Sequence, residues 1–296
     1  MQCNGDTIQK TVFKFGLKQH SIMRWRDQGQ SDNVEDRRGM SGRGMAVGGG
    51  GIGILILALA VFLCGGDPRS LLQGVQDSQP AIQQPGQQQN KSTDENAQFA
   101  SAVLKTTENA WGEILPQQAR IRYTPPKLVL FTDQIASACG NASAATGPFY
   151  CPGDQKLYLD FGFFRELQNE FGAKGDFAQA YVIAHEVGHH VQNLLGTMDK
   201  VDRAGSSNRL SVALELQADC YAGVWANYVQ KKGLLETGDA QEALTAASSV
   251  GDDMIQKRTQ GYVVPESFTH GSAQQRMSWF AKGMQTGEIK QCQTFK

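Results

Sequence analysis

Residues 180–196 read AYVIAHEVGHHVQNLLG and contain an H-E-x-x-H motif at His185, Glu186 and His189. The aliphatic residues around the motif predict a buried helix, on which residues four apart share a face. The two histidines can therefore bind one ion, while Glu186 faces a water molecule beside it. This pattern is typical of hydrolysis with Zn²⁺ as the cofactor and a carboxylate as the general base. The alternative is an ordinary helix with surface histidines.

Histidine is scarce, which limits the choice of a third metal ligand. The five histidines are His20, His185, His189, His190 and His270. His190 lies about 100° round the helix from His189. We therefore expect it either to face solvent or to hydrogen-bond a metal ligand on the side away from the metal. A better third ligand is Glu215 in VALELQADCYAG, on the next predicted helix, because a His-His-Glu set leaves one position open for water. Asp219, one turn on, would bind the second nitrogen of a ligating imidazole.

The balance of charge excludes one class of partner. The 28 basic and 29 acidic side chains give a net charge of −1. This offers no global attraction for a polyanion, so we do not expect a nucleic acid partner.

The cysteines bear on whether the folded part of the chain lies in an oxidising compartment. The chain has Cys3, Cys64, Cys139, Cys151, Cys220 and Cys292, with no C-x-x-C pair. If the part after the apolar run faces an oxidising compartment, Cys139 with Cys151 and Cys220 with Cys292 are candidate disulfides. The alternative is four reduced, partly buried thiols.

An apolar run without charge covers residues 46–64 and is just long enough to cross a bilayer as a helix. Its glycines leave a cleaved signal peptide, centred on residues 52–63, as an alternative; acylation at Cys64 is a weaker one. Most flanking basic residues precede the run, so we expect the N-terminus in the cytoplasm and the rest outside. The sequence thus predicts a single-pass membrane protein whose folded domain lies outside the cytoplasm, in a periplasm or its equivalent.

The apolar run and the composition of the chain on either side of it divide the sequence into four expected regions. Residues 1–45 form a cytoplasmic tail, residues 46–64 the transmembrane anchor, residues 65–95 a Gln-rich flexible linker, and residues 96–296 one folded domain. Within the domain, the periodicity predicts an opening helix over residues 99–115 and strands at residues 127–131 and 156–160. Further helices are expected at residues 161–171, at residues 177–195 with Gly196 as the C-terminal cap, and at residues 209–230. The fold class is α+β, mainly helical with a small sheet.

The motifs together carry a family resemblance. His185-Glu186-x-x-His189 followed by Glu215-x-x-x-Asp219 is similar to the glutamate-zincin metallopeptidases. Within them the chain resembles the bacterial putative neutral zinc metallopeptidase family, which implies a zincin-like fold. The resemblance also covers MRWRDQGQSDNVEDRRG from Met23, GPFYCPGDQKLYLD from Gly147 and SFTHGSAQQRMSWFAKG from Ser267. Members of the family usually begin near the position of Met23, so residues 1–22 are expected to be a misassigned start.

The resemblance implies further roles. The strand at residues 156–160 would be the edge strand that aligns an extended substrate. FTHGSAQQR is similar to a T-H-x-x-x-x-x-R pattern near related active sites, which makes His270 a catalytic candidate for stabilising the oxyanion and Arg276 a candidate for structural pairing. Tyr221 and Tyr262 are rival proton donors, and for each the simpler interpretation is a packing aromatic.

The sequence therefore predicts a membrane-anchored zinc metalloendopeptidase that hydrolyses a peptide or protein substrate, with Glu186 as the general base. A zinc hydrolase for cell-wall or lipid amides would use the same residues. A membrane-tethered, non-proteolytic scaffold with a zincin fold is the alternative from a different class. The presence of Glu186 argues against the scaffold, because a structural zinc site needs no general base.

Overall fold

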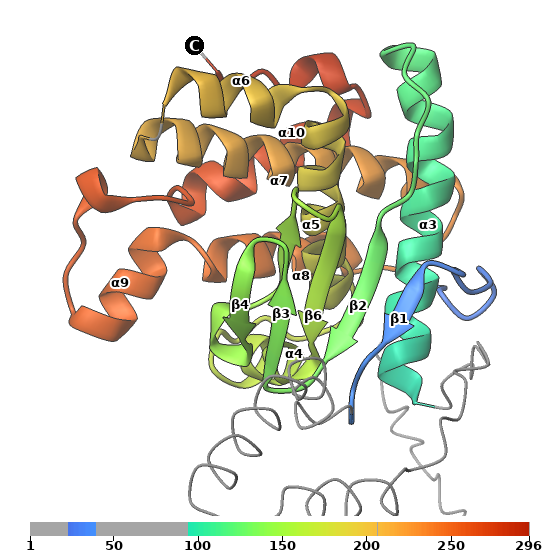
Figure 1. Ribbon diagram of the computed structural model, residues 1–296, viewed down its shortest axis with the longest axis horizontal. Coiled ribbons are helices and arrows are strands. Elements are labelled where there is room, and N and C mark those ends of the chain that lie inside the picture. Colours follow the sequence, from blue (N-terminus) through green and yellow to red (C-terminus); the bar gives the residue numbers. More distant parts are fainter. Residues whose placement is uncertain (1–22, 40–93, 206, 296) are drawn as a thin grey trace, which may run out of the picture.

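The computed structural model describes residues 23–39, 94–205 and 207–295. Within these ranges helices dominate over a small sheet, which confirms the α+β class (Figure 1). The anchor predicted at residues 46–64, most of the linker and residues 1–22 lie outside the described residues. No helix in the described ranges is both long and apolar enough to cross a membrane.

The described strands all precede helix α4, and the rest of the domain is helical. The strands are β1 (Val34–Asp36), β2 (Lys127–Phe131), β3 (Gln134–Ser137), β4 (Gly140–Ser143), β5 (Phe149–Cys151) and β6 (Lys156–Asp160). The α-helices are α3 (Glu95–Gln118), α4 (Phe161–Asn169), α5 (Asp176–Leu194), α6 (Thr197–Ala204), α7 (Asn208–Lys231), α8 (Asp239–Ser249), α9 (Asp252–Gln260) and α10 (Ala273–Thr286). Short 3₁₀ turns occur at Ala144–Thr146, Pro265–Ser267 and Ile289–Gln291.

The main sheet has the strand order β1-β2-β6-β5, and only β5 runs antiparallel to its neighbour. The strand β6 is therefore central, and the expectation that residues 156–160 form the edge strand is wrong. The reason is a hairpin: Phe149–Cys151 and Lys156–Asp160 are joined by a turn that begins Pro152-Gly153. Such a turn between two apolar runs signals a hairpin, and it makes β5 the edge beside β6.

The helices form one core around α5. Helix α5 packs on α7 and α8, and α7 packs along most of α10 (Figure 1). Gly223 and Gly283 allow the close approach of α7 and α10, since a Cβ on Gly283 would lie 1.9 Å from the carbonyl oxygen of Cys220. Phe177 of α5 stacks on Trp225 of α7 with ring centroids 5.4 Å apart.

Both candidate disulfides are present. Cys139 bonds Cys151 across the sheet hairpins with the Cα atoms 5.8 Å apart, and Cys220 of α7 bonds Cys292 near the C-terminus with the Cα atoms 5.6 Å apart. The second bridge ties the final segment to the middle of α7, which carries Glu215 and Asp219.

Residues 23–39 belong to the folded domain rather than to a separate tail. Met23 and Trp25 are buried in the main core, and Trp25 packs edge-on against Phe99 of α3. Strand β1 pairs in parallel with β2, and Arg38 forms an ion pair with Asp94, the N-cap of α3. The domain therefore extends beyond the expected start at residue 96, because the chain on both sides of residues 40–93 packs together.

Replacing Trp25 tests whether this segment stabilises the domain. Trp25→Ala is expected to reduce the free energy of unfolding by about 3–5 kcal/mol, as for other buried aromatic residues, when measured by urea denaturation. Arg24→Ala is the control, because Arg24 is exposed, and its bond to another described residue is from its backbone N–H to the carbonyl of Leu234. Equal stability of the two variants would show that residues 23–39 do not pack on the domain.

Candidate metal centre

The centre lies where α5 crosses α7. His185 and His189 come from consecutive turns of α5, and their ring centroids are 4.8 Å apart. Glu215 of α7 faces both: its carboxylate oxygens lie 3.1 Å from His185 Nε2 and 3.4 Å from His189 Nε2. The three residues can each offer one ligand atom within 4.8 Å of the others. The structure thus brings together the three residues that the sequence predicts as metal ligands.

Hydrogen bonds on the far side of each ring fix its tautomer. His185 Nδ1 lies 2.9 Å from a carboxylate oxygen of Asp219, which can only accept. His189 Nδ1 lies 2.8 Å from Gln192 Oε1, and the amide group of Gln192 donates to the carbonyl of Leu214. Both imidazoles therefore donate through Nδ1–H and direct Nε2 at Glu215, whose carboxylate accepts the second ring proton. Loss of that proton frees the Nε2 lone pair for a metal ion, as in metal-ligating histidines.

Asp219 is held by charge as well as by His185. Arg276 of α10 donates to its two oxygens from Nε at 2.9 Å and from Nη2 at 3.0 Å. The hydroxyl of Tyr181, one turn before His185, also donates to Asp219. Asp219 is fully buried and Arg276 nearly so. The predicted structural pairing of Arg276 is confirmed, and Asp219 occupies the supporting position expected of it.

The pKa values of the site residues depend on the buried carboxylates of Asp219 and Glu215. Burial alone would lower the pKa of His185, but Asp219 and Glu215 outweigh it and raise that pKa to about 10. Burial alone would raise the pKa of Glu215, but the two imidazoles hold it well below its usual value. Burial raises the pKa of Glu186. A metal ion would replace the protons on the two histidines, so its binding releases protons.

The short distance between α5 and α7 depends on Gly188. A Cβ at this position would lie 2.9 Å from the carbonyl oxygen of Ala218 and 3.1 Å from its Cα. Gly188 precedes His189, and Ala218 lies between Glu215 and Asp219 in the chain. The absence of a side chain therefore sets the helix spacing at which the ligands meet.

Comparison with known proteins agrees with this geometry. The sequence model of the family "Putative neutral zinc metallopeptidase" matches residues 23–295. The chain belongs to this family. It is 46% identical over 289 residues to the uncharacterized protein YpfJ of Escherichia coli K12, an alignment covering 92% of this chain and 99% of that protein. It is also 46% identical over 206 residues to an uncharacterized protein of Mycobacterium bovis, covering 66% of this chain and 69% of that protein. No solved structure matches.

The ligand set of this zinc metallopeptidase family member fits zinc. A tetrahedral zinc with bonds of about 2.0–2.1 Å places its ligand atoms about 3.3 Å apart. His185 Nε2 lies 3.1 Å from Oε2 of Glu215, and His189 Nε2 lies 3.4 Å from Oε1, so each nitrogen is near that distance from one carboxylate oxygen. Two nitrogens and one carboxylate leave a position for water or substrate, as in catalytic rather than structural zinc sites.

The other candidate residues lie in different surroundings. His270 follows α9 in a loop, half exposed, with Nδ1 close to Thr269 and Asp252. Asp252 also accepts the backbone N–H groups of residues 269–271, which fixes the loop. Tyr221 is buried against Trp111, 5.7 Å between ring centroids. Tyr262 is 63% exposed beyond α9, the helix that projects at the left in Figure 1. No contact joins either tyrosine to the three ligands among the described residues.

His190 differs from expectation, because it does not face solvent. It is fully buried, with Nε2 2.7 Å from the carbonyl oxygen of Thr124 and Nδ1 3.0 Å from the hydroxyl of Tyr150. The carbonyl can only accept, so Nε2 carries the proton and Nδ1 accepts from Tyr150. Burial lowers the pKa of His190. It therefore fastens α5 to the edge strand β5 and points away from the metal ligands.

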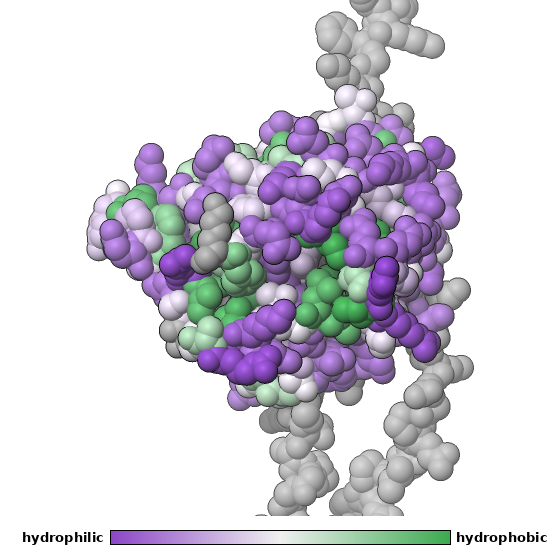
Figure 2. Space-filling model, turned by 90° about the horizontal axis from the view of Figure 1, so that it is seen from above, coloured by the Kyte–Doolittle hydropathy of each residue, from purple (hydrophilic) through white to green (hydrophobic). Residues whose placement is uncertain are grey.

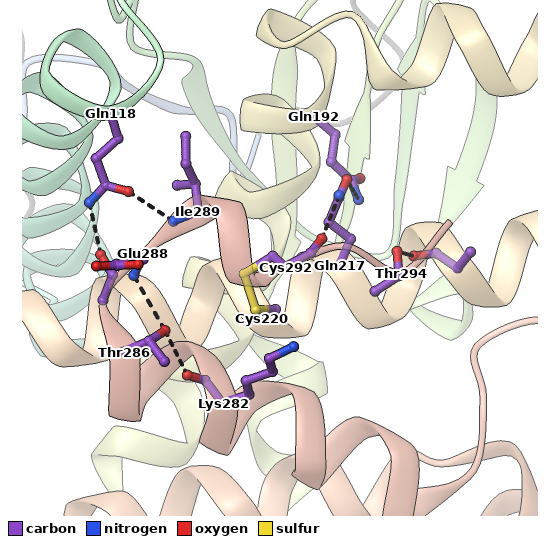
Figure 3. The surroundings of a disulfide bond; sticks show 12 residues. Gln118, Gln192, Gln217, Cys220, Lys282, Thr286, Glu288, Ile289, Cys292 and Thr294 are labelled. Atoms are coloured by element: carbon purple, nitrogen blue, oxygen red, sulfur yellow. Dashed lines mark hydrogen bonds between the residues drawn. A yellow bond between two sulfur atoms is a disulfide. The ribbon is translucent and has the colours of Figure 1, made fainter. Parts of the chain in front are cut away.

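Two supporting residues were missed by the sequence reasoning. Gln192 orients His189 and bonds Gln217, which donates to the carbonyl of Cys292 beside the Cys220–Cys292 disulfide (Figure 3). Tyr181 binds Asp219. The available signal was helical spacing: Tyr181 precedes His185 by four residues, and Gln192 follows His189 by three.

Gly188→Ala is expected to weaken zinc binding at least tenfold, in line with the loss that displaced supporting groups cause, because the methyl group would push α5 and α7 apart. Zinc affinity would be measured by competition with a chelating dye. Gly112→Ala in α3 is the matched control, since a Cβ there meets nothing within 4 Å. Unchanged affinity in Gly188→Ala would contradict the close crossing.

Proposed function

We propose that this protein is a zinc-dependent peptidase of zincin-like architecture. The observation that carries the proposal is the convergence of His185, His189 and Glu215. Hydrogen bonds at Nδ1 orient both imidazoles, and the buried general-base candidate Glu186 lies on the same helix as the two histidines. Zinc bound there would polarise the substrate carbonyl and lower the pKa of a water molecule.

The residues of the chain would then carry out the proton transfers. Glu186 takes one proton from the attacking water as its oxygen bonds to the carbonyl carbon, and passes it to the amine as the C–N bond breaks. The raised pKa of Glu186 suits both steps, because the carboxylate must accept and then release the proton. His270 is proposed to stabilise the oxyanion: the hydrogen bond to Asp252 raises its pKa and engages Nδ1, which leaves Nε2 for the substrate.

An extended peptide suits the surroundings. Strand β5 is the last strand of the sheet, and the Tyr150 contacts to His190 and Asn193 hold it against α5. Its outer edge is the proposed place for an added substrate strand. The surface seen from above is mainly hydrophilic, with apolar side chains gathered in hollows between polar ones (Figure 2). An unfolded or extended segment of protein is therefore the proposed substrate class.

Glu186→Gln is expected to lower kcat/KM for a fluorescently labelled unfolded protein by at least about 100-fold, since general-base catalysis contributes that much. Zinc content should remain one per chain, because Glu186 is not a proposed ligand. Glu170→Gln, at the exposed end of α4, is the control and should leave both values unchanged. Full activity in Glu186→Gln, or zinc-loaded wild-type protein that cleaves no protein substrate, would refute the proposal.

We also propose that residues 46–64 attach the protein to a membrane, on the strength of their apolar sequence. The pairing of β1 with β2 limits how they can do so. A single crossing between residues 39 and 94 would put residues 23–39 and the domain on opposite faces. Moreover, Arg37 and Arg38, on which the predicted orientation partly rested, form ion pairs with acidic neighbours. We therefore propose that both flanks lie on one side, in an oxidising compartment that preserves the disulfides.

Cysteine labelling tests this arrangement in intact cells. Asp32→Cys and Lys257→Cys place thiols at exposed positions on the two flanks, in a chain with Cys3 and Cys64 changed to Ser. A membrane-impermeant maleimide is expected to label both. Labelling of Lys257→Cys alone would indicate a single crossing, and labelling of neither would place both flanks in the cytoplasm.

A further inference from the structure

The Cys220–Cys292 disulfide lies in the interior of the domain, close to the metal centre. Both cysteines are fully buried, and the bond joins the middle of α7 to the segment that follows α10. Cys220 comes five residues after Glu215, which is about 7.5 Å along a helix. The proposed mechanism gives this bond no part, although it lies beside the helix that carries a ligand.

A chain of hydrogen bonds joins the disulfide to a metal ligand. The carbonyl of Cys292 accepts from Nε2 of Gln217 at 2.8 Å. Oε1 of Gln217 accepts from Nε2 of Gln192 at 3.2 Å, and Oε1 of Gln192 accepts from Nδ1 of His189 at 2.8 Å. Figure 3 shows the two glutamine side chains pointing toward one another beside the disulfide. The position of the Cys292 carbonyl is thus connected to the orientation of the His189 ring.

The two glutamines have few other groups to bond. Gln192 is fully buried and Gln217 is 4% exposed, and a buried polar group that loses its partner is strongly unfavourable. Nε2 of Gln192 also donates to the carbonyl of Leu214 at 2.7 Å, which directs its Oε1 at His189. If Gln217 loses its acceptor, its amide group either keeps an unpaired donor or turns, and a turn removes the acceptor that Gln192 uses.

Loss of the disulfide would move Cys292 rather than Cys220. Cys220 is in the interior of α7, where α10 packs so closely that a Cβ on Gly283 would lie 1.9 Å from the Cys220 carbonyl oxygen. Cys292 instead follows the short 3₁₀ turn Ile289–Gln291. Two thiol sulfur atoms in van der Waals contact lie farther apart than two bonded ones. The Cys292 backbone must then shift away from α7, and its carbonyl leaves Gln217.

Contacts on either side of Cys292 keep such a shift local. Thr294 donates from its hydroxyl to the carbonyl of Ala213 at 2.6 Å, and the backbone N–H of Ile289 donates to Gln118 at 2.9 Å. The final segment would therefore stay on the domain while the hydrogen bond to Gln217 is lost.

We propose that Gln217 is a positioning residue that couples the Cys220–Cys292 disulfide to His189, so that the oxidised chain binds zinc more tightly than the reduced chain. The inference rests on the zinc site of the proposed function. Oxidation joins the two Sγ atoms while the two thiols give up two protons and two electrons to a disulfide oxidant, which leaves as two thiols. Because both cysteines are buried, the bond forms as the chain folds. Zinc is then held tightly only by chains that fold in an oxidising compartment.

The zinc affinity of the full chain, measured by competition with a chelating dye, tests this coupling. Gln217→Leu removes the hydrogen bonds of the amide group and keeps the disulfide, whereas Cys220→Ser with Cys292→Ser removes the disulfide and keeps Gln217. Each protein is expected to bind zinc about tenfold more weakly than wild type, as when other groups that orient ligands are lost. The triple variant should bind no more weakly than the disulfide variant, because both changes interrupt one path.

The second disulfide supplies a matched control. Cys139→Ser with Cys151→Ser removes a bond between the hairpins of the two sheets, and Gln230→Leu changes an exposed glutamine of α7. Both proteins should bind zinc as tightly as wild type. Glu215→Gln measures the background from other zinc sites. One other group of carboxylates that could hold a metal consists of Asp176, Asp239 and Glu242.

Wild-type affinity in Gln217→Leu or in the Cys220/Cys292 variant would overturn the coupling. So would losses that multiply in the triple variant, which would make the two effects independent, or an equal loss in the Cys139/Cys151 variant, which would show a general loosening. Gln217→Leu decides the matter even where the disulfide variant does not fold. Wild-type protein that binds no zinc would overturn this inference together with the proposed function, whereas zinc-loaded protein that cleaves nothing would refute the peptidase alone.

Discussion

The buried carboxylate of Asp219 is the centre on which the arrangement of the helices depends. It receives hydrogen bonds from Arg276 of α10 and from Tyr181 and His185 of α5, while it is itself part of α7. A buried ion pair adds little net stability, but removal of one partner leaves a charge without compensation. Burial alone would raise the pKa of Asp219, yet Arg276 and His185 keep it below its usual value. The group is thus an anion that orients a metal ligand.

Two small residues make this geometry sterically possible. Gly188 brings α5 onto Ala218 of α7, and Gly283 brings α10 onto Cys220 of the same helix. The ligands of one helix, the carboxylates of the second and the arginine of the third then meet within hydrogen-bonding distance. The Cys220–Cys292 disulfide and the Gln192–Gln217 contact reinforce the same crossing from the side of the C-terminus (Figure 3).

The sequence predicted the three residues that converge at the candidate metal centre and the helices that carry them, because both depend on local spacing. The predicted helix at residues 177–195 and the observed α5 differ by one residue at each end. Helices α8 and α10 were not predicted, since their buried faces consist largely of Ala243, Ala246 and Ala247, and of Arg276 and Gly283 beside Phe280. Such faces lack the bulky apolar residues that reveal a helix. Met23 and Trp25 are buried by residues that are distant in the sequence. A local sequence pattern cannot predict such contacts.

The central claim is that one zinc ion binds between α5 and α7, and diffraction from crystals at the zinc absorption edge tests it most directly. The account predicts one anomalous peak, within about 2.0–2.2 Å of Nε2 of His185, Nε2 of His189 and a carboxylate oxygen of Glu215. A peak among Asp176, Asp239 and Glu242 instead, or no peak in protein loaded with zinc, would contradict it.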